Sequence, residues 1–250
     1  MIQPDTRRQM TREDVQLAIR VMTRAAGGTT GDAREDERAL EERLSDEGLD
    51  AVLDDPRLPT ALLQDPLGAL ASLRLLTYVL VRSALVRMGE EDRVISDYSA
   101  AVVLAFGARG RAQRCSDADD ELYDTLADLL RDAESRDPRR AFLVRTHLGN
   151  YALWLSGLFP DYIEHRRWRR GGPHLEYYEE MGKRGFAMAA EHPAARQQGM
   201  AELYGAMAER FATLRVALTL FSDRLMFPGV HTPERLMRQA RDETRWRWRN

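Results

Sequence analysis

Residues 67–88 read LGALASLRLLTYVLVRSALVRM and form the most apolar stretch of the chain. The pair before it, Asp65-Pro66, is typical of a helix start, because aspartate caps free backbone N–H groups and proline suits the first helical position. Three arginines, at positions 74, 82 and 87, interrupt the stretch. Each charge near the centre of a bilayer costs about 2.5–3.5 kcal/mol on insertion scales. The sequence therefore predicts a central core helix rather than a membrane span.

The composition around this stretch is that of a folded protein. The chain has 250 residues, 44% of them hydrophobic and 31% charged, and its net charge is −3. This balance excludes both a disordered chain and a globally basic nucleic-acid binder. Cys115 is the only cysteine, so no internal disulfide forms, and the first residues hold no apolar signal segment. Lys183 is the only lysine, which indicates a GC-rich genome. From the composition, the missing signal segment and the charged apolar stretch we expect a bacterial cytoplasmic protein without a transmembrane segment.

Charge is spread unevenly along the chain. Residues 1–65 hold nine arginines and fifteen acidic residues, whereas residues 137–250 hold nineteen basic and thirteen acidic residues. The acidic front and the basic rear suggest either contact between the two halves or a basic face offered to a partner.

Capping, proline and glycine signals predict an all-α protein, a single multi-helix bundle of about nine to eleven helices with no sheet. Residues 1–31 are expected to form an N-terminal helix and a flexible glycine-rich link, and residues 32–250 the helical bundle domain. The basic C-terminal helix is expected over 232–250. The other expected helices lie at about 33–47, 67–88, 91–106, 117–135, 138–158, 160–168, 174–190 and 194–226.

Motifs for the commonest chemistries are missing. No Glu-x-x-His or His-Glu-x-x-His spacing occurs. Asp161 and His165 lie one helical turn apart and could present two metal ligands, but a structural or solvent-exposed pair is the better interpretation. No glycine-rich phosphate loop and no nucleophile elbow are present. The sequence thus predicts no metal and no cofactor, and it favours a non-enzymatic protein.

The most unusual segment is 145–182, where polar aromatic side chains share one helix face. His147, Asn150, Tyr151 and Trp154 follow helical spacing. One interpretation is a ligand pocket, and the other is a buried polar network that fixes how two helices dock. In the second, Gly149, Ser156, Gly157 and Gly182 are small so that backbones can approach. The candidate pocket residues are His147, Asn150, Tyr151, Trp154, Tyr177, Tyr178 and Glu179.

Part of this segment resembles a set of uncharacterised bacterial all-helical proteins. The resemblance rests on Gly149-Asn150-Tyr151, Leu155-Ser156-Gly157-Leu158-Phe159, Tyr177-Tyr178-x-x-Met181-Gly182-x-x-Gly185-Phe186, and Phe211, Leu214, Leu218 and Ser222. It covers about residues 140–225. In that set an Asp is often found at the position of Asn150 and a Tyr at that of Phe186, and the replacement of the acid by Asn150 weakens any catalytic or metal role there. The resemblance implies a helical fold and no particular activity.

Two short segments interleave arginine with tryptophan, a pattern typical of phosphate binding and base stacking or of a membrane interface. The candidate basic patch consists of Arg166, Arg167, Trp168, Arg169 and Arg170, together with Arg245, Trp246, Arg247, Trp248 and Arg249.

Three functions remain open from the sequence. The first is a non-enzymatic interaction or regulatory module, with a protein partner or a second copy as a homodimer. The second is a small-molecule-binding protein or enzyme with a pocket around His147, Tyr151 and Tyr177. The third is a nucleic-acid or anionic-lipid binder through the arginine–tryptophan segments.

Overall fold

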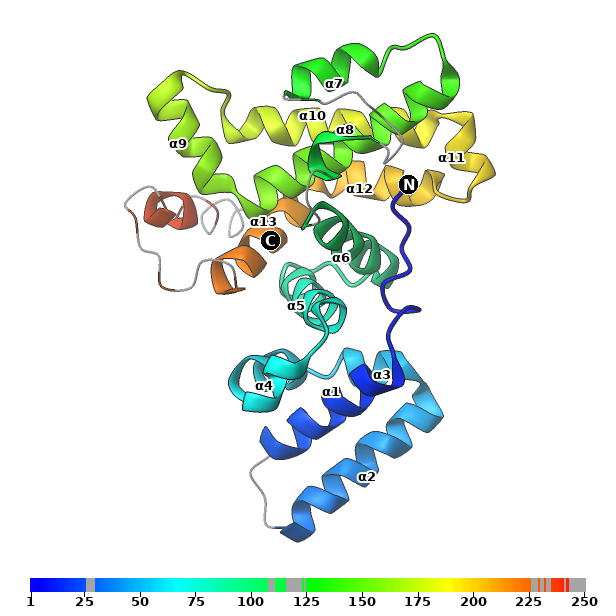
Figure 1. Ribbon diagram of the computed structural model, residues 1–250, viewed down its shortest axis with the longest axis vertical. Helices are drawn as coiled ribbons and strands as arrows, with labels where there is room; N and C mark the ends of the chain where they lie inside the picture. The colour runs from blue at the N-terminus through cyan, green and yellow to red at the C-terminus, as the bar shows by residue number, and fades with distance from the viewer. Residues whose placement is uncertain are drawn as a thin grey trace. The chain divides into compact units, whose positions relative to one another are not determined.

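The computed structural model describes residues 1–25, 30–107, 111–115, 123, 125–225, 229, 232, 235–240 and 242. These residues form the helices α1 to α13, a further helical stretch at 235–240 and two short 3-10 helices, with no strand among them (Figure 1). The all-α prediction is therefore confirmed. Contacts divide the chain into an N-terminal unit, residues 2–104, and a C-terminal unit, residues 105–250 together with Met1.

The N-terminal unit is built on α5, the helix expected from the apolar stretch. Its elements are α1 (Arg12–Ala25), α2 (Thr30–Glu47), α3 (Leu49–Leu53), α4 (Leu58–Gln64), η1 (Pro66–Leu70), α5 (Leu73–Arg87) and most of α6 (Arg93–Gly107). Apolar side chains on several sides of α5 are buried, among them Leu75, Val79, Val81 and Leu85. Helix α1 packs on α2, α3 and α4. The contacts thus group α1 with the helices that follow it.

The expected helix 67–88 begins later than the sequence suggested. Asp65 accepts a hydrogen bond from the Leu67 backbone, but it caps the short η1 rather than the long helix. Gly68 lies so close to α4 that a Cβ there would meet the Leu62 carbonyl oxygen at 1.9 Å. The chain then turns, and Ser72 caps α5 by accepting a hydrogen bond from the Leu75 backbone N–H at 3.1 Å.

The C-terminal unit is built on α8, which packs on α7, α10 and α13. Its elements are η2 (Arg111–Gln113), α7 (Leu126–Asp132), α8 (Pro138–Leu158), α9 (Pro160–Arg170), α10 (Leu175–Glu191), α11 (Pro193–Gln197), α12 (Ala201–Glu209) and α13 (Phe211–Leu225). The expected start of α8 is confirmed, because the Asp137 side chain accepts a hydrogen bond from the Arg139 backbone and Pro138 follows directly. Helix α9 ends at Gly171, whose φ of 64° is a left-handed conformation that suits glycine.

Two other expected helices are shorter than predicted. The segment 194–226 is divided into α11, α12 and α13, because Gly199 turns the chain at a φ of 67° and a second break falls at Arg210. Helix α7 begins at Leu126, since Thr125 is extended and caps it by accepting a hydrogen bond from the Asp128 backbone, and residues 117–122 and 124 of the expected helix lie outside the described residues. These breaks raise the number of helices above the expected nine to eleven.

No helix in the described part of the chain is both long enough and apolar enough to span a bilayer.

Candidate functional site

Three of the predicted pocket residues form a row of rings along α8. Ring centroids of His147 and Tyr151 lie 6.1 Å apart, and those of Tyr151 and Trp154 also lie 6.1 Å apart. Phe106 packs edge-on against both His147, at 5.3 Å, and Trp154, at 5.8 Å. The Nε2 atom of His147 lies 3.0 Å from the carbonyl oxygen of Ala112, which accepts a hydrogen bond from it. The helical spacing therefore identified a real cluster, held by ring packing.

The other predicted pocket residues have different surroundings. Asn150 is buried within α8. Tyr177 packs edge-on against Tyr178, and the pKa of Tyr178 is raised, since burial outweighs the opposing charge of Arg166 on α9. Glu179, the next residue, turns to α13 instead. A single pocket shared by all seven residues stays a prediction.

Glu179 is one partner of a buried arginine. The Arg215 side chain is only 1% exposed, and its Nε donates to Glu179 Oε1 at 2.7 Å while its Nη2 donates to Asp242 Oδ1 at 2.8 Å. Burial alone would lower the pKa of Arg215, but the hydrogen bond to Asp242 and the charges of both carboxylates outweigh burial, so the pKa of Arg215 is raised. A buried charge is tolerated only with such partners. The contact that defines Glu179 is thus an internal ion pair.

A second group of ion pairs fastens the C-terminal residues of the described chain. Arg238 donates from Nε to Asp161 of α9 at 2.8 Å and from Nη2 to Asp223 of α13 at 3.0 Å. Arg235 pairs with the same Asp223 at 2.7 Å. Residues 235–240 are therefore held against α9 and α13, and Asp161, the possible metal ligand beside His165, is paired with an arginine.

The glycines of the resemblance pattern lie where α8, α10 and α13 approach most closely. A Cβ on Gly149 would meet the Phe186 ring at 2.7 Å, and one on Gly182 would meet the Phe211 ring at 2.1 Å. A Cβ on Gly157 would meet Leu218 at 2.7 Å. These contacts join all three parts of the pattern, so its glycines serve helix packing.

Hydroxyl groups on α13 complete the same interface. Thr219 Oγ1 donates to the Gly157 carbonyl oxygen at 2.9 Å, and Ser222 Oγ donates to that of Leu158 at 2.7 Å. Both carbonyls belong to the last turn of α8, where no intrahelical donor remains. Ser222, a residue of the pattern, thereby satisfies a buried helix end.

The first half of the predicted basic patch, Arg166 to Arg170, occupies the last turns of α9. Trp168 is 69% exposed, and the Arg167 guanidinium lies 5.4 Å from its ring centroid. The Arg166 guanidinium lies 5.7 Å from the ring of Tyr162, one turn earlier. The second half, residues 245–249, lies outside the described residues and stays a prediction.

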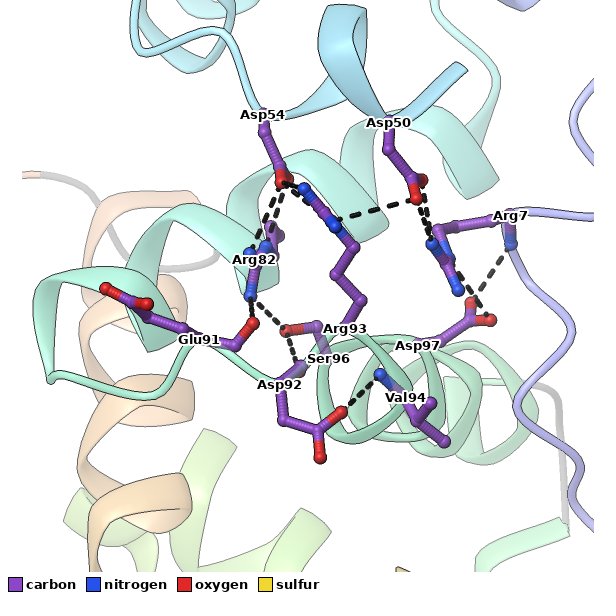
Figure 2. A network of polar contacts seen from close by, with 10 residues as sticks. All are labelled: Arg7, Asp50, Asp54, Arg82, Glu91, Asp92, Arg93, Val94, Ser96 and Asp97. Atoms are coloured by element: carbon purple, nitrogen blue, oxygen red, sulfur yellow. Dashed lines mark hydrogen bonds and ion pairs between the residues drawn. The ribbon is translucent and has the colours of Figure 1, made fainter. Parts of the chain in front are cut away.

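The N-terminal unit holds a polar network that the sequence interpretation missed (Figure 2). Arg82 of α5 is buried, and it donates to Asp54 at 3.0 Å, to the Glu91 carbonyl oxygen at 2.8 Å and to Ser96 at 3.3 Å. Arg93 of α6 reaches the other Asp54 oxygen at 2.7 Å. Figure 2 shows both guanidinium groups converging on Asp54. The signal that could have found them is Arg82 itself, because a charge within a core helix requires a partner.

The same network continues to the start of the chain. Arg7 donates to Asp50 at 2.7 and 2.9 Å, and its backbone N–H donates to Asp97 at 3.0 Å. Arg93 lies 3.7 Å from Asp50 and so joins the two parts (Figure 2). Burial raises the pKa of Asp97 despite the opposing hydrogen bonds and charge of Arg7.

The network alternates three arginines with three aspartates and is neutral as a whole. The Tyr78 hydroxyl is buried beside it without a hydrogen-bond partner among the described residues. Burial raises the pKa of this phenol, while the neighbouring Arg7 opposes the rise, so Tyr78 stays protonated at neutral pH. With its charges satisfied internally, the network ties the N-terminal segment, α3, α5 and α6 together.

An exposed apolar surface lies elsewhere in the N-terminal unit. Leu63, Leu70 and Leu73 are 45%, 73% and 70% exposed and come from α4, η1 and α5, with α4 packing on both other elements. Residues 66–73 carry no charged side chain, and Asp65, which stands between Leu63 and this stretch, pairs with Arg24 at 2.9 Å. We refer to these three residues as the leucine corner.

Among the described residues, no three histidine, cysteine, aspartate or glutamate side chains are grouped so that they could hold a metal ion. Comparisons of the chain with known protein families, with curated proteins and with solved structures find no match. Function is therefore argued from the geometry above.

Proposed function

We propose that this protein is a non-enzymatic interaction module that associates with a second copy of itself through the leucine corner. The observation that carries the proposal is the exposure of Leu63, Leu70 and Leu73 on α4, η1 and α5, where α4 packs on the other two elements, while other leucines of the same unit are buried. Contiguous exposed apolar surface is typical of interaction sites.

A second copy is the partner that this surface fits best. A two-fold contact places the same surface patch of both copies against each other, so any charge within it would face its like. Residues 66–73 are uncharged and present no such conflict. Burial of each leucine contributes about 1.5–3 kcal/mol. Because association has its own entropic cost, three leucines per copy favour a weak, concentration-dependent dimer.

Sedimentation velocity between low and high micromolar concentration tests the proposal. The wild-type protein is expected to shift from monomer to dimer, and the double variant L70E/L73E is expected to remain monomeric with an unchanged circular dichroism spectrum. The control is V86E, because Val86 is an exposed apolar residue of the same helix about 20 Å from Leu73. A monomer at every concentration, or a dimer unaffected by L70E/L73E, would exclude the leucine corner as the contact.

Native mass spectrometry at low salt tests the ligand-binding alternative on the same sample. A small molecule that leaves on denaturation would favour a pocket near His147 and Tyr151 over a module that acts only through protein contacts.

A further inference from the structure

Helix α9 presents an exposed basic and aromatic face in the C-terminal unit. Its buried side consists of Pro160, Ile163 and Glu164. The opposite side is solvent-exposed or half-exposed, and at 100° per residue its members lie around one arc of the helix, which also holds Asp161, the partner of Arg238. We call this surface the α9 face, and its members are Tyr162, His165, Arg166, Trp168, Arg169 and Arg170.

Three arginines of the α9 face form no ion pair with the carboxylates of the described residues. Arg167 points toward the buried side and lies 3.6 Å from Glu164. Across the part of the chain that the structure describes, Arg166, Arg169 and Arg170 form no ion pair. This distinguishes them from the arginines at 7, 82, 215, 235 and 238, which all pair with aspartate or glutamate. The α9 face is therefore a site of uncompensated positive charge on a protein whose net charge is negative.

Large side chains beside these arginines are also exposed. Trp168 and Tyr162 expose 69% and 51% of their surface. Tryptophan and tyrosine are enriched where protein meets the headgroup region of a bilayer, because each combines an apolar ring with a polar group. The arginines and the rings together fit a surface that is anionic outside and apolar beneath.

Two exposed aliphatic side chains lie on the segment that is fastened to α9. The bond from Arg238 to Asp161 fastens residues 235–240, which are helical, to α9 (Figure 1). Arg235 and Arg238 turn inward, whereas Leu236 and Met237 are each more than half exposed. Aliphatic side chains bury in the acyl region of lipid, whereas nucleic-acid bases stack on aromatic rings.

We propose that the α9 face, together with Leu236 and Met237, binds the surface of an anionic lipid membrane. Arg166, Arg169 and Arg170 contact lipid phosphates and carboxylates, and Trp168 enters the headgroup region. The proposal concerns a different unit from the leucine corner and does not depend on dimer formation. Each arginine near an anionic bilayer strengthens binding about fivefold, so three contribute roughly a hundredfold. Binding is expected to weaken as salt screens these charges.

Vesicle flotation with the full chain tests this inference. The probes are vesicles of phosphatidylcholine alone and vesicles with about a third of phosphatidylserine. The wild-type protein is expected to float with the anionic vesicles at low salt and not with the neutral ones. The variant R166Q/R169Q/R170Q should lose roughly a hundredfold in affinity. The variant W168A should bind less tightly, and the salt dependence of its binding should be unchanged, because it removes no charge.

The matched control is R131Q/R136Q/R139Q, which removes the same charge from exposed positions of the same unit outside α9. This control should retain binding, and circular dichroism should show that both triple variants are folded. Absence of wild-type flotation at low salt would overturn the inference, as would equal losses in the two triple variants. Retention on single-stranded DNA without vesicle binding would also overturn it, and would assign the α9 face to nucleic acid.

Discussion

Replacing Glu179 with glutamine tests whether this residue belongs to the fold or to a ligand site. Glu179 Oε1 lies 2.7 Å from Arg215 Nε, and both side chains are at most 5% exposed. At this distance, with an effective dielectric constant of about 20, the Coulomb attraction is about 6 kcal/mol before desolvation is subtracted. Removing one partner of a buried pair costs about 3–5 kcal/mol in practice.

The lower end of that range is expected for E179Q, because Asp242 remains bound to Arg215 at 2.8 Å. We therefore expect the unfolding free energy of the C-terminal unit to fall by about 3 kcal/mol. For a unit of this size, such a loss lowers the melting temperature by about 6–12 °C. Tryptophan fluorescence during urea unfolding reports on this unit alone, because all four tryptophans, at 154, 168, 246 and 248, belong to it.

The matched control is E180Q, on the next residue of α10, whose side chain is exposed. A surface substitution of this kind changes stability by less than about 0.5 kcal/mol. If E179Q were as stable as E180Q, the buried ion pair would not stabilise the fold, and Glu179 would return as a candidate ligand contact.

Three further predictions concern packing, capping and pH. G182A should destabilise the C-terminal unit by more than 1 kcal/mol, because its Cβ would meet the Phe211 ring at 2.1 Å. The control G205A, in α12, should stabilise the unit by about 0.5–1 kcal/mol, because its Cβ would meet no atom within 4 Å. The urea midpoints of the two variants, followed by tryptophan fluorescence, compare these effects. S72A should lower the stability of the N-terminal unit by about 1 kcal/mol, because α5 loses its N-terminal cap, and faster amide hydrogen exchange in α5 measures this loss. The control is S83A, which replaces a serine inside the same helix that caps no helix end. Burial raises the pKa of Asp54, but hydrogen bonds from two arginines lower it more, so the ionised Asp54 stabilises the fold fully above its unfolded pKa of about 3.9. This stability is lost as the pH falls through the lower folded pKa. The variant D54N should therefore lose less stability below about pH 4 when unfolding is followed by circular dichroism, and an acid profile identical to that of the wild type would contradict the assignment.

Local signals in the sequence predicted much of the secondary structure. Thr11 and Asp14 form a capping box, a pattern legible in the sequence, since each side chain accepts a hydrogen bond from the other residue's backbone N–H. The start of α8 at Asp137-Pro138 is of the same kind. In both cases the determining atoms lie within three residues of one another, so the sequence alone contains the information.

The helix ends that tertiary contacts determine, and the carboxylate partners of the buried arginines, could not be predicted in this way. Apolar periodicity continues across Ser72 and Gly199, and only the contact of Gly68 with α4 and the left-handed conformation of Gly199 show where helices end. The pairs Arg82–Asp54 and Arg215–Glu179 join residues 28 and 36 positions apart. Arg82 was interpreted only as an argument against a membrane span, whereas its burial identifies it as the centre of a network.

The paired and unpaired arginines together explain why the α9 face is the more informative surface. Arg82 and Arg215 are buried, and burial of a charge is tolerable only when carboxylates surround it, so their partners are a condition of folding. Arg169 and Arg170 are exposed and Arg166 is half-exposed beside Tyr162, so none of them needs a carboxylate partner for the fold to form. Four adjacent arginines beside an exposed tryptophan therefore cannot be accounted for by stability, since an exposed Trp168 contributes little to the core. Binding to an anionic surface gives both side-chain types a role, and R166Q/R169Q/R170Q separates that role from the fold because it should leave the melting temperature unchanged.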